Sequence, residues 1–366
     1  MNRSGTAFRR VAVAFLSSGC RTVGCLVGLL LAAVLTGAAT AGPLTFTNYT
    51  TTNGLGSNDV NSVYVSGGTI YAATANGLST STNSGTTWSN KNQANGLIQN
   101  YQYTVYTSGS TIYAGGSGGI SISRNNGATW TTRSAASVAG SEAGNVYGIY
   151  AIGNSVYAAT DDGGFGISAN SGTTWTTSGT ANGLETDYTY AIYASGSTLY
   201  GATDGSGVGI SANGGASWIN KTTANGLAND FVRGIYALGG TIYAATQGGL
   251  SISSNGGTSW TNYTTANGLV NNWTLDVYAD GSTIYVGSLG GLSISTNGGT
   301  SWTNYTTADG LGDDEVKGVF AVDGTVYAAT AGGLSIAAVP EPSTYCMALA
   351  GLAFGGFSMF RRRTRA

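Results

Sequence analysis

The chain has 366 residues, of which 60 are Gly, 22 are Tyr and only 8% are charged, with a formal net charge of −2. So much Gly and Tyr with so few charged residues argues against a helical protein and favours many short strands joined by tight turns. There is no His, which excludes a Ser-His-Asp triad and removes the commonest general base and most catalytic zinc sites.

The N-terminal segment has the three parts of a secretory signal peptide. Four arginines precede residue 22, an apolar run follows at residues 23–35, and Ala39-Thr40-Ala41 supplies small residues for cleavage. This order predicts a signal peptide at residues 1–41 and export of the rest of the chain. Because the basic region is long, an uncleaved anchor helix is the alternative.

One eight-residue box, Ser-x-Asn-x-Gly-x-Thr/Ser-Trp, recurs six times between the two ends of the chain. Its copies are 81–88, 123–130, 168–175, 211–218, 253–260 and 295–302. The tryptophans are 42 to 45 residues apart, which is the length of one four-stranded propeller blade.

The sequence after each Trp is also repeated. It gives a Thr-rich segment, an Asn-Gly-Leu loop, a segment ending in Ile/Val-Tyr, a segment such as Thr-Ile-Tyr-Ala-Ala-Thr, and Leu-Ser-Ile-Ser. Apolar residues alternate with Thr or Ser, and the breaks contain Gly or Asn, as is typical of strands and tight turns. We name these predicted strands D, A, B and C in unit order. The Tyr of each strand B and the Trp of each box are predicted core residues.

The two ends of the repeat region are complementary. Residues 44–50 match residues 300–306, so the body opens with an isolated strand D, whereas residues 333–336 are a strand C with no strand D after them. The sequence therefore predicts an all-β, seven-bladed β-propeller over residues 42–338, with four-stranded antiparallel blades. The N-terminal strand completes the last blade and leaves no open sheet edge. An open β-solenoid is the alternative.

The boxes resemble the Asp-box (BNR) repeats of sialidases and of many non-enzymatic propellers, although all six copies hold Asn where that motif has Asp. Both residues cap tight turns through a side-chain oxygen, so we expect the turn to persist. The Ala-Asn-Gly-Leu loops followed by Ile-Tyr-Ala resemble the propeller repeats of two-component regulators. Both resemblances imply a scaffold and not a particular reaction.

The body is more acidic than the whole chain. Residues 42–338 hold six basic and fifteen acidic residues, a net charge of −9, because eight arginines lie in the end segments. All three cysteines also lie in the end segments, so the body has to be stable without disulfides. A net negative body argues against nucleic acid and anionic membrane surfaces as partners.

Sialidase chemistry, which the Asp-box resemblance raises, is not expected. It needs three arginines on one ligand, and Arg124 lies in a box while Arg133 lies on an outer strand, so they cannot meet Arg233. A glycoside hydrolase or polysaccharide lyase that uses two loop carboxylates stays open as an alternative. Because no pair of acids stands out, we predict a protein that is not an enzyme and requires no cofactor.

Twelve of the fifteen body acids are predicted to lie on one face. In a propeller the D–A and B–C loops share a face, and these acids lie in or just after those loops: Asp59, Glu142, Asp161, Asp162, Glu185, Asp187, Asp204, Asp230, Asp309, Asp313, Asp314 and Glu315. An acidic face suits a cation such as Ca²⁺, or a polyol. The alternative is that the acids have no binding role and lie on this face only because the other face is filled by short turns and boxes.

Two columns of the repeat vary from unit to unit at the start of strand A. The first is Asp59, Tyr101, Asn145, Tyr188, Phe231, Trp273 and Glu315, and the second, two residues later, is Asn61, Tyr103, Tyr147, Tyr190, Arg233, Leu275 and Lys317. A packing column repeats, whereas contacts to a ligand differ from blade to blade. Period-two geometry places both columns on one side of strand A. We predict ligand-binding residues at the channel mouth: Tyr101, Tyr103, Tyr147, Tyr188, Tyr190, Phe231, Arg233, Trp273, Asp59, Asp314 and Glu315. Irregular filling of the channel by bulky rings is the alternative.

The C-terminal segment, residues 339–366, contains Pro340-Glu341-Pro342, an apolar stretch at 344–360 and Arg361-Arg362-Arg363. The stretch is long enough to span a bilayer, and the arginines would stop its transfer. A tail anchor is the plain interpretation, but the three parts in this order resemble the PEP-CTERM sorting signal. That resemblance implies export in a Gram-negative bacterium, transient anchoring in the inner membrane and processing by an exosortase-type enzyme.

Proteins with this signal usually accompany exopolysaccharide or biofilm matrix, and the aromatic columns indicate binding. We therefore predict an exported propeller that binds extracellular polysaccharide or another matrix or cell-surface component. Besides the hydrolase or lyase already named, a structural matrix protein without a specific ligand is an alternative.

Overall fold

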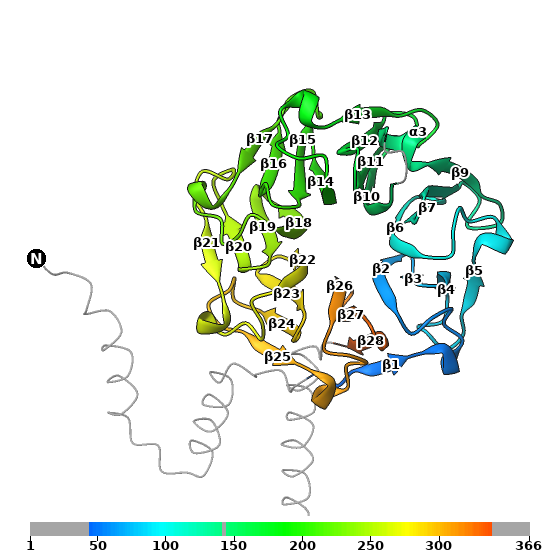
Figure 1. Ribbon diagram of the computed structural model, residues 1–366. Coiled ribbons are helices and arrows are strands. Elements are labelled where there is room, and N and C mark those ends of the chain that lie inside the picture. The colour runs from blue at the N-terminus through cyan, green and yellow to red at the C-terminus, as the bar shows by residue number, and fades with distance from the viewer. Residues whose placement is uncertain (1–43, 141–143, 339–366) are drawn as a thin grey trace, which may run out of the picture. The chain divides into compact units, whose positions relative to one another are not determined.

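The computed structural model describes residues 44–140 and 144–338. These residues form seven four-stranded antiparallel sheets, arranged as blades around one axis (Figure 1). The predicted all-β, seven-bladed propeller is confirmed. The predicted signal peptide, the span at 344–360, the sorting residues and Glu142 lie outside the described residues.

No helix within residues 44–140 and 144–338 has the length and apolar character needed to cross a bilayer.

Each blade pairs an inner strand with a second, a third and an outer strand. The inner strands are β2 (Val60–Ser66), β6 (Gln102–Ser108), β10 (Val146–Ile152), β14 (Thr189–Ser195), β18 (Val232–Leu238), β22 (Thr274–Asp280) and β26 (Val316–Val322). The second strands are β3 (Thr69–Thr74), β7 (Thr111–Gly116), β11 (Ser155–Thr160), β15 (Thr198–Thr203), β19 (Thr241–Thr246), β23 (Thr283–Ser288) and β27 (Thr325–Thr330). The third strands are β4 (Gly77–Ser81), β8 (Gly119–Ser123), β12 (Phe165–Ser168), β16 (Val208–Ser211), β20 (Gly249–Ser253), β24 (Gly291–Ser295) and β28 (Gly333–Ala338). The outer strands are β5 (Ser89–Lys91), β9 (Thr131–Ser134), β13 (Thr176–Ser178), β17 (Ile219–Lys221), β21 (Thr261–Tyr263), β25 (Thr303–Tyr305) and β1 (Thr47–Tyr49).

The N-terminal strand closes the ring as predicted. Strand β1 pairs antiparallel with β28, with Asn48 opposite Ser335, and the two ends of the body therefore share one sheet. The Asn48 amide adds a hydrogen bond to the Gly332 carbonyl, at 3.0 Å. Leu44 and Phe46 are buried in a cluster that also contains residues of the neighbouring blade. Strand β1 is therefore held by side-chain packing as well as by its backbone hydrogen bonds to β28.

A short helix follows the outer strand in each D–A connection. These helices are η1 (Thr51–Asn53), η2 (Gln93–Asn95), α3 (Ala135–Ala139), η3 (Thr180–Asn182), η4 (Thr223–Asn225), η5 (Thr265–Asn267) and η6 (Thr307–Asp309). After η1, Gly54 has φ +102°, which L side chains rarely adopt, and Leu55 is buried in the core. The Asn-Gly-Leu loop of the sequence is thus a capped helical turn with an apolar anchor.

Each box is a turn tied together by its Ser and its Asn. In the box at 211–218, Asn213 Oδ1 accepts a hydrogen bond from the Ser217 amide at 2.9 Å, and Asn213 Nδ2 donates to Ser217 Oγ at 2.9 Å. Trp218 is buried, and its indole donates to Ser178 Oγ at 2.8 Å. The other five box tryptophans are only half-buried, although they pack against the core clusters. The prediction of core tryptophans therefore holds in full only for Trp218.

Every inner strand starts with a β-bulge. In β2, Val60 pairs with Thr74 and Ser62 pairs with Ala73, so Asn61 is the extra residue. The bulge interrupts the period-two alternation, and the adjacent residues Asn61 and Ser62 both line the channel. Val60 is fully buried between blades. The second to fifth residues of the inner strands thus line the channel, with the exception of Gly234.

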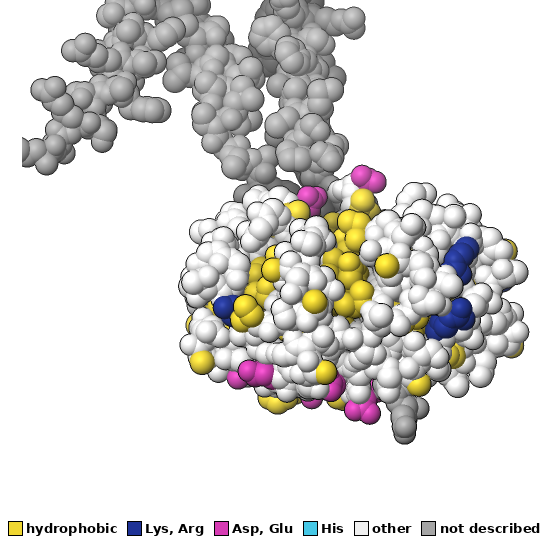
Figure 2. Space-filling view, turned by 90° about the horizontal axis from the view of Figure 1, so that it is seen from above, with side chains coloured by type: hydrophobic (Ala, Val, Ile, Leu, Met, Phe, Trp, Pro, Cys, Tyr) yellow, Lys and Arg dark blue, Asp and Glu magenta, His cyan; other side chains and the backbone are white. Residues whose placement is uncertain are grey.

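The outer surface carries few charges. In the view of Figure 2, uncharged side chains and backbone dominate, and acidic and basic side chains occur in small separate groups. This agrees with the low charged fraction of the sequence.

Deleting residues 44–50 removes β1 and exposes the edge of β28. We expect a loss of many degrees in melting temperature, or aggregation, because an unpaired edge strand is a template for association. Circular dichroism melting of the purified protein measures it, with Thr45→Ala, an exposed position, as control. A truncated protein that melts within a few degrees of the control would contradict closure through β1.

Within the box at 211–218, Trp218→Ala should lower the free energy of unfolding by about 3–5 kcal/mol, because it removes a buried ring. Asn213→Asp should cost less than about 1 kcal/mol, because a carboxylate accepts the same bonds and the Ser217 hydroxyl can rotate to donate. Urea denaturation of both variants tests this. An equal loss in both would show that the Asn amide group is itself essential.

Candidate functional site

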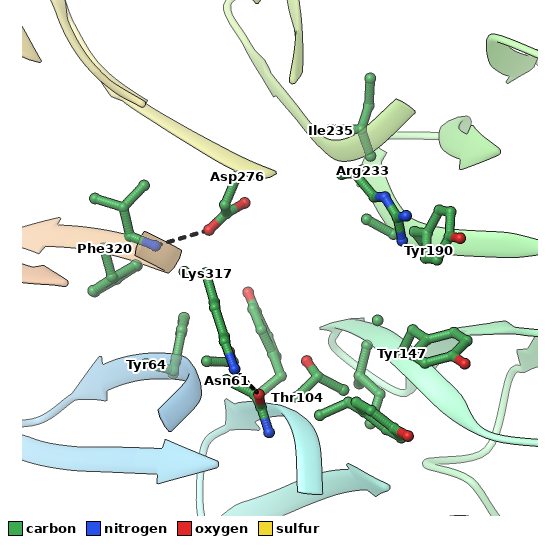
Figure 3. A pocket seen from close by; sticks show the side chains of 18 of the residues that line it. Asn61, Tyr64, Thr104, Tyr147, Tyr190, Arg233, Ile235, Asp276, Lys317 and Phe320 are labelled. Carbon is green, nitrogen blue, oxygen red and sulfur yellow. Dashed lines mark hydrogen bonds between the residues drawn. The ribbon is translucent and has the colours of Figure 1, made fainter. Parts of the chain in front are cut away.

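The seven inner strands surround a central cavity of about 350 Å³. The second to fifth residues of the inner strands line it, except for Gly234, and Figure 3 labels several of them, among them Arg233, Ile235 and Asp276. We name the second residues of the strands the mouth level, the third residues the chamber level and the fifth residues the aromatic ring. The mouth level is the second variable column predicted from the sequence: Asn61, Tyr103, Tyr147, Tyr190, Arg233, Leu275 and Lys317.

The first variable column lies one residue before each inner strand, next to the mouth level. The residues between the two columns are fully buried: Val60, Gln102, Val146, Thr189, Val232, Thr274 and Val316. The two columns meet at several blades, because Tyr101 contacts Tyr103 and Tyr188 contacts Tyr190. The structure thus brings most of the predicted residues to one end of the channel.

Tyrosines form one sector of the mouth, across blades two to four. Centroid distances are 4.8 Å for Tyr101–Tyr103, 4.7 Å for Tyr103–Tyr147 and 5.6 Å for Tyr147–Tyr190. The hydroxyls of Tyr147 and Tyr188 lie 3.2 Å apart. All five tyrosines are half-buried, so each ring keeps an accessible part.

The next sector of the mouth is apolar and exposed. Phe231 is 42% exposed and Trp273 is 41% exposed, and both precede the inner strands of neighbouring blades. Leu289 is exposed as well, and its amide donates to the Trp273 carbonyl at 3.1 Å. Neither ring is among the described residues that line the cavity, but each lies two residues before a mouth-level residue, and rings this exposed are available to a ligand.

The last sector, at the closure between blades seven and one, is charged. Lys317 forms an ion pair with Asp59, the only one within residues 44–140 and 144–338, and Tyr101 donates to the other Asp59 oxygen at 3.5 Å. Burial by itself would lower the pKa of Lys317. The hydrogen bond and the negative charge of Asp59 act in the opposite direction, and the pKa is raised. Lys317 is therefore a fixed cation at the mouth.

The two other predicted acids differ in position. Glu315 lies beside the cavity mouth. Asp314 instead accepts a hydrogen bond from the Thr307 amide at 2.7 Å, as Asn58 does from Thr51 in another blade. The structure therefore gives Asp314 a role in capping its loop.

Arg233 is held over the Tyr190 ring, with its guanidinium carbon 4.0 Å from the ring centroid. Its Nε is buried without a hydrogen-bond partner among the described residues. Tyr190 donates to Asp204 Oδ1 at 3.2 Å. Burial raises the pKa of Tyr190 to about 12 although Arg233 acts against it, so the phenol stays a donor. The other two arginines, Arg124 and Arg133, lie in a box and on β9.

The chamber level was not predicted as part of the site. Six of its members are small or uncharged and one is an acid: Ser62, Thr104, Gly148, Ala191, Gly234, Asp276 and Gly318. Asp276 Oδ2 accepts a hydrogen bond from the Val319 amide of the next blade at 2.9 Å, and the carboxyl group lines the cavity (Figure 3). Burial raises its pKa to about 7, against the effect of the Val319 and Val277 amides. Comparing this column between units would have revealed the acid.

The aromatic ring lines the other end of the channel. It consists of one residue from each blade: Tyr64, Tyr106, Tyr150, Tyr193, Tyr236, Tyr278 and Phe320. Neighbouring rings lie 4.4–5.1 Å apart between centroids all the way round. Burial, with neighbouring phenols, raises the pKa of Tyr106, Tyr150 and Tyr236. These tyrosines are the last residues of the Ile/Val-Tyr motif. Because they repeat from unit to unit like core residues, comparison of the units did not identify them as channel residues.

The D–A and B–C loops meet at the mouth end, as expected for a shared face. Asn145 donates to Asp161 at 2.7 Å, and the Gly164 amide donates to the Asp187 carbonyl at 2.7 Å. No group of three or more potential metal-binding side chains occurs among the residues that the structure describes. Calcium binding stays a prediction.

Asp276 makes stability depend on pH. Its folded-state pKa of about 7 exceeds the unfolded value, so its contribution is fully present below about pH 4 and is lost as pH rises to about 7. The Asp276→Asn substitution changes the free energy of unfolding by one amount at pH 4 and by another at pH 8. We expect the change at pH 8 to be more stabilising than the change at pH 4 by about 2–4 kcal/mol. Denaturation at both pH values measures this, with Asp280→Asn, exposed on the same strand, as control. Equal pH dependence in the Asp276→Asn variant and the unmodified protein would refute it.

Comparison with known proteins identifies the C-terminal signal. Residues 338–363 match the family model of the PEP-CTERM protein-sorting motif. No curated protein is similar to this chain in sequence.

Solved structures share the propeller at low sequence identity. An extracellular domain assigned to a hybrid two component system of B. thetaiotaomicron is 18% identical with a TM-score of 0.70, over 81% of this chain and 41% of that one. YCF48 from Cyanidioschyzon merolae is 14% identical with a TM-score of 0.60, over 81% and 99%. An ancestral GH74 enzyme is 20% identical with a TM-score of 0.59, over 81% and 46%.

These likenesses show the fold alone, and the chain spans less than half of the two component domain and of the GH74 enzyme. The motif is more informative, because it is a recognition signal for exosortase processing. The chain is thus an exported protein that carries a C-terminal PEP-CTERM sorting signal on a seven-bladed propeller.

Proposed function

We propose that the protein binds an extracellular polysaccharide of the matrix or cell surface at the channel mouth, without reacting with it. The observation that carries this proposal is the aromatic arc. It runs from the tyrosines of blades two to four to Phe231 and Trp273 of blades five and six. On the outer strands, Tyr49 and Tyr263 instead pair singly with box tryptophans, Trp88 and Trp302.

The chemistry of the mouth suits sugars. Aromatic rings pack against the apolar faces of sugar rings and supply large contact areas at low entropic cost. Asn61, Arg233 and Lys317 supply polar groups at the same level, which fix orientation in a binding site.

The sorting motif supports an extracellular partner, because an exported protein meets the matrix and not cytoplasmic ligands. An exosortase-type enzyme is its processing partner. The acidic body, with a net charge of −9, disfavours nucleic acid, since nucleic-acid binding relies on basic residues.

Asp276 favours a second candidate, a glycoside hydrolase. A carboxyl group with a pKa near 7 in a cavity suits a general acid, and Asp59 or Glu315 would have to be its partner. Asp59, however, is already engaged by Lys317, so we rank binding first. Release of sugar fragments by the pure protein would support the hydrolase instead. Binding to no polysaccharide at all would favour a purely structural matrix protein.

Trp273→Ala and Tyr188→Ala should weaken binding to the polysaccharide secreted by the producing bacterium at least fivefold, because truncating one aromatic anchor commonly costs about 1–4 kcal/mol. Ile219→Ala is the matched control, since Ile219 is apolar and 65% exposed on outer strand β17. Binding is measured by calorimetry on the full-length protein, with and without calcium. Weaker binding in Ile219→Ala but not in the mouth variants would place the ligand on the rim.

A further inference from the structure

We infer that the polymer bound at the mouth is acidic, and that Arg233 binds a carboxylate group of its sugars. This inference rests on the proposed function and specifies its ligand, a polysaccharide that contains uronic acids or other carboxylated sugars. Arg233 is then the residue that distinguishes such a polymer from a neutral one.

The mouth level carries positive charge although the body is acidic. Two of the six basic residues of the body, Arg233 and Lys317, belong to this level, and none of the acidic residues does. Both basic residues line the cavity. Asp59 neutralises Lys317, whereas Arg233 has no ion pair among the residues that the structure describes. An anionic group of a ligand is the partner that this cation lacks.

The guanidinium of Arg233 is held by stacking. Its central carbon lies 4.0 Å from the centroid of the Tyr190 ring, and Figure 3 shows the two side chains next to each other at the cavity wall. Within the described part of the chain, its Nε is buried without a hydrogen-bond partner, and its terminal nitrogens are not among the enclosed atoms. These terminal N–H groups can form the paired hydrogen bonds that fit a carboxylate.

An exposed aromatic ring lies at the same boundary between blades four and five. The Tyr190 hydroxyl donates to Asp204, and a Cβ on the next residue, Gly205, would lie 3.5 Å from the Phe231 ring. Phe231 is 42% exposed. This boundary therefore offers an apolar face for a sugar ring and, beside it, a guanidinium for the carboxylate of the same or a neighbouring sugar.

The acids near Arg233 have other partners. Asp204 accepts the hydrogen bond from Tyr190 at 3.2 Å, and Asp276 accepts one from the Val319 amide at 2.9 Å. The remaining acids of the body act on a ligand mainly from a distance, and at physiological salt exposed charges beyond about 8 Å are largely screened. A carboxylate in direct contact with Arg233 therefore gains more than the net charge of the body costs it.

Chemical reduction of the polymer tests the inference. The polysaccharide secreted by the producing bacterium is treated with a carbodiimide and then borohydride, which converts its carboxyl groups to primary alcohols. Calorimetry with the full-length protein compares the native and the reduced polymer at physiological salt. We expect reduction to weaken binding about tenfold or more, because it removes a charge-assisted hydrogen bond. Equal or tighter binding of the reduced polymer overturns the inference.

A variant assigns the effect to Arg233. Arg233→Gln should weaken binding of the native polymer about tenfold or more, and it should bind both polymers equally, because the group that distinguishes them is gone. Arg233→Lys keeps the charge but not the planar fork and should fall between. Arg133→Gln, on outer strand β9, is the control and should keep the preference. Thermal melts check folding. An Arg233→Gln protein that prefers the native polymer as strongly as the unmodified protein does overturns the inference.

The proposed function fails separately. If Trp273→Ala weakens binding of both polymers while reduction has no effect, binding at the mouth stands and only the acidic character of the ligand is wrong. If the unmodified protein binds neither polymer, both are wrong.

Discussion

The pairing of β1 with β28 is the constraint on which the rest of the structure depends. It involves three residues of β1, yet it joins segments almost 290 residues apart and gives the seventh blade its fourth strand. With the ring closed, each inner strand has a neighbour on both sides and the seven strands share one axis. Residues at the same position of the repeat then meet at the same level of the channel, and a level can act as one wall.

Repetition and variation along the inner strands follow from this arrangement. The first residues of these strands are fully buried between blades, where each has nearly the same neighbours, so they vary little in size. The mouth level faces a space shared by all blades, and no packing requirement makes its members alike. Tyrosines, an apolar sector and the Lys317–Asp59 pair therefore occupy separate arcs of one opening. A binding surface with different sectors is built on a scaffold of nearly identical units.

Asp276 shows the cost of such variation. Its carboxyl group lines the channel, where burial disfavours the charge, and the backbone amides of Val319 and Val277 offset part of that cost. The carboxylate of Asp59, at the mouth, is instead stabilised by its ion pair with Lys317. Asp276 is the one ionisable group at the chamber level, whose other members are uncharged.

The sequence by itself determined the blade length, the blade count, closure by residues 44–50 and the C-terminal signal, because each depends on local periodicity or on a contiguous motif. Comparison between units also found the mouth level, since Asn61 and its equivalents vary where packing residues repeat. Only the tertiary structure decided which neighbours these residues have. The bulge after Val60 turns two adjacent residues toward the channel, which strict alternation does not predict, so the chamber and Asp276 were missed. Tyr64 and its equivalents repeat like core residues, and only their convergence on one axis makes them a ring. Lys317 meets Asp59 because closure brings together residues that are far apart along the chain.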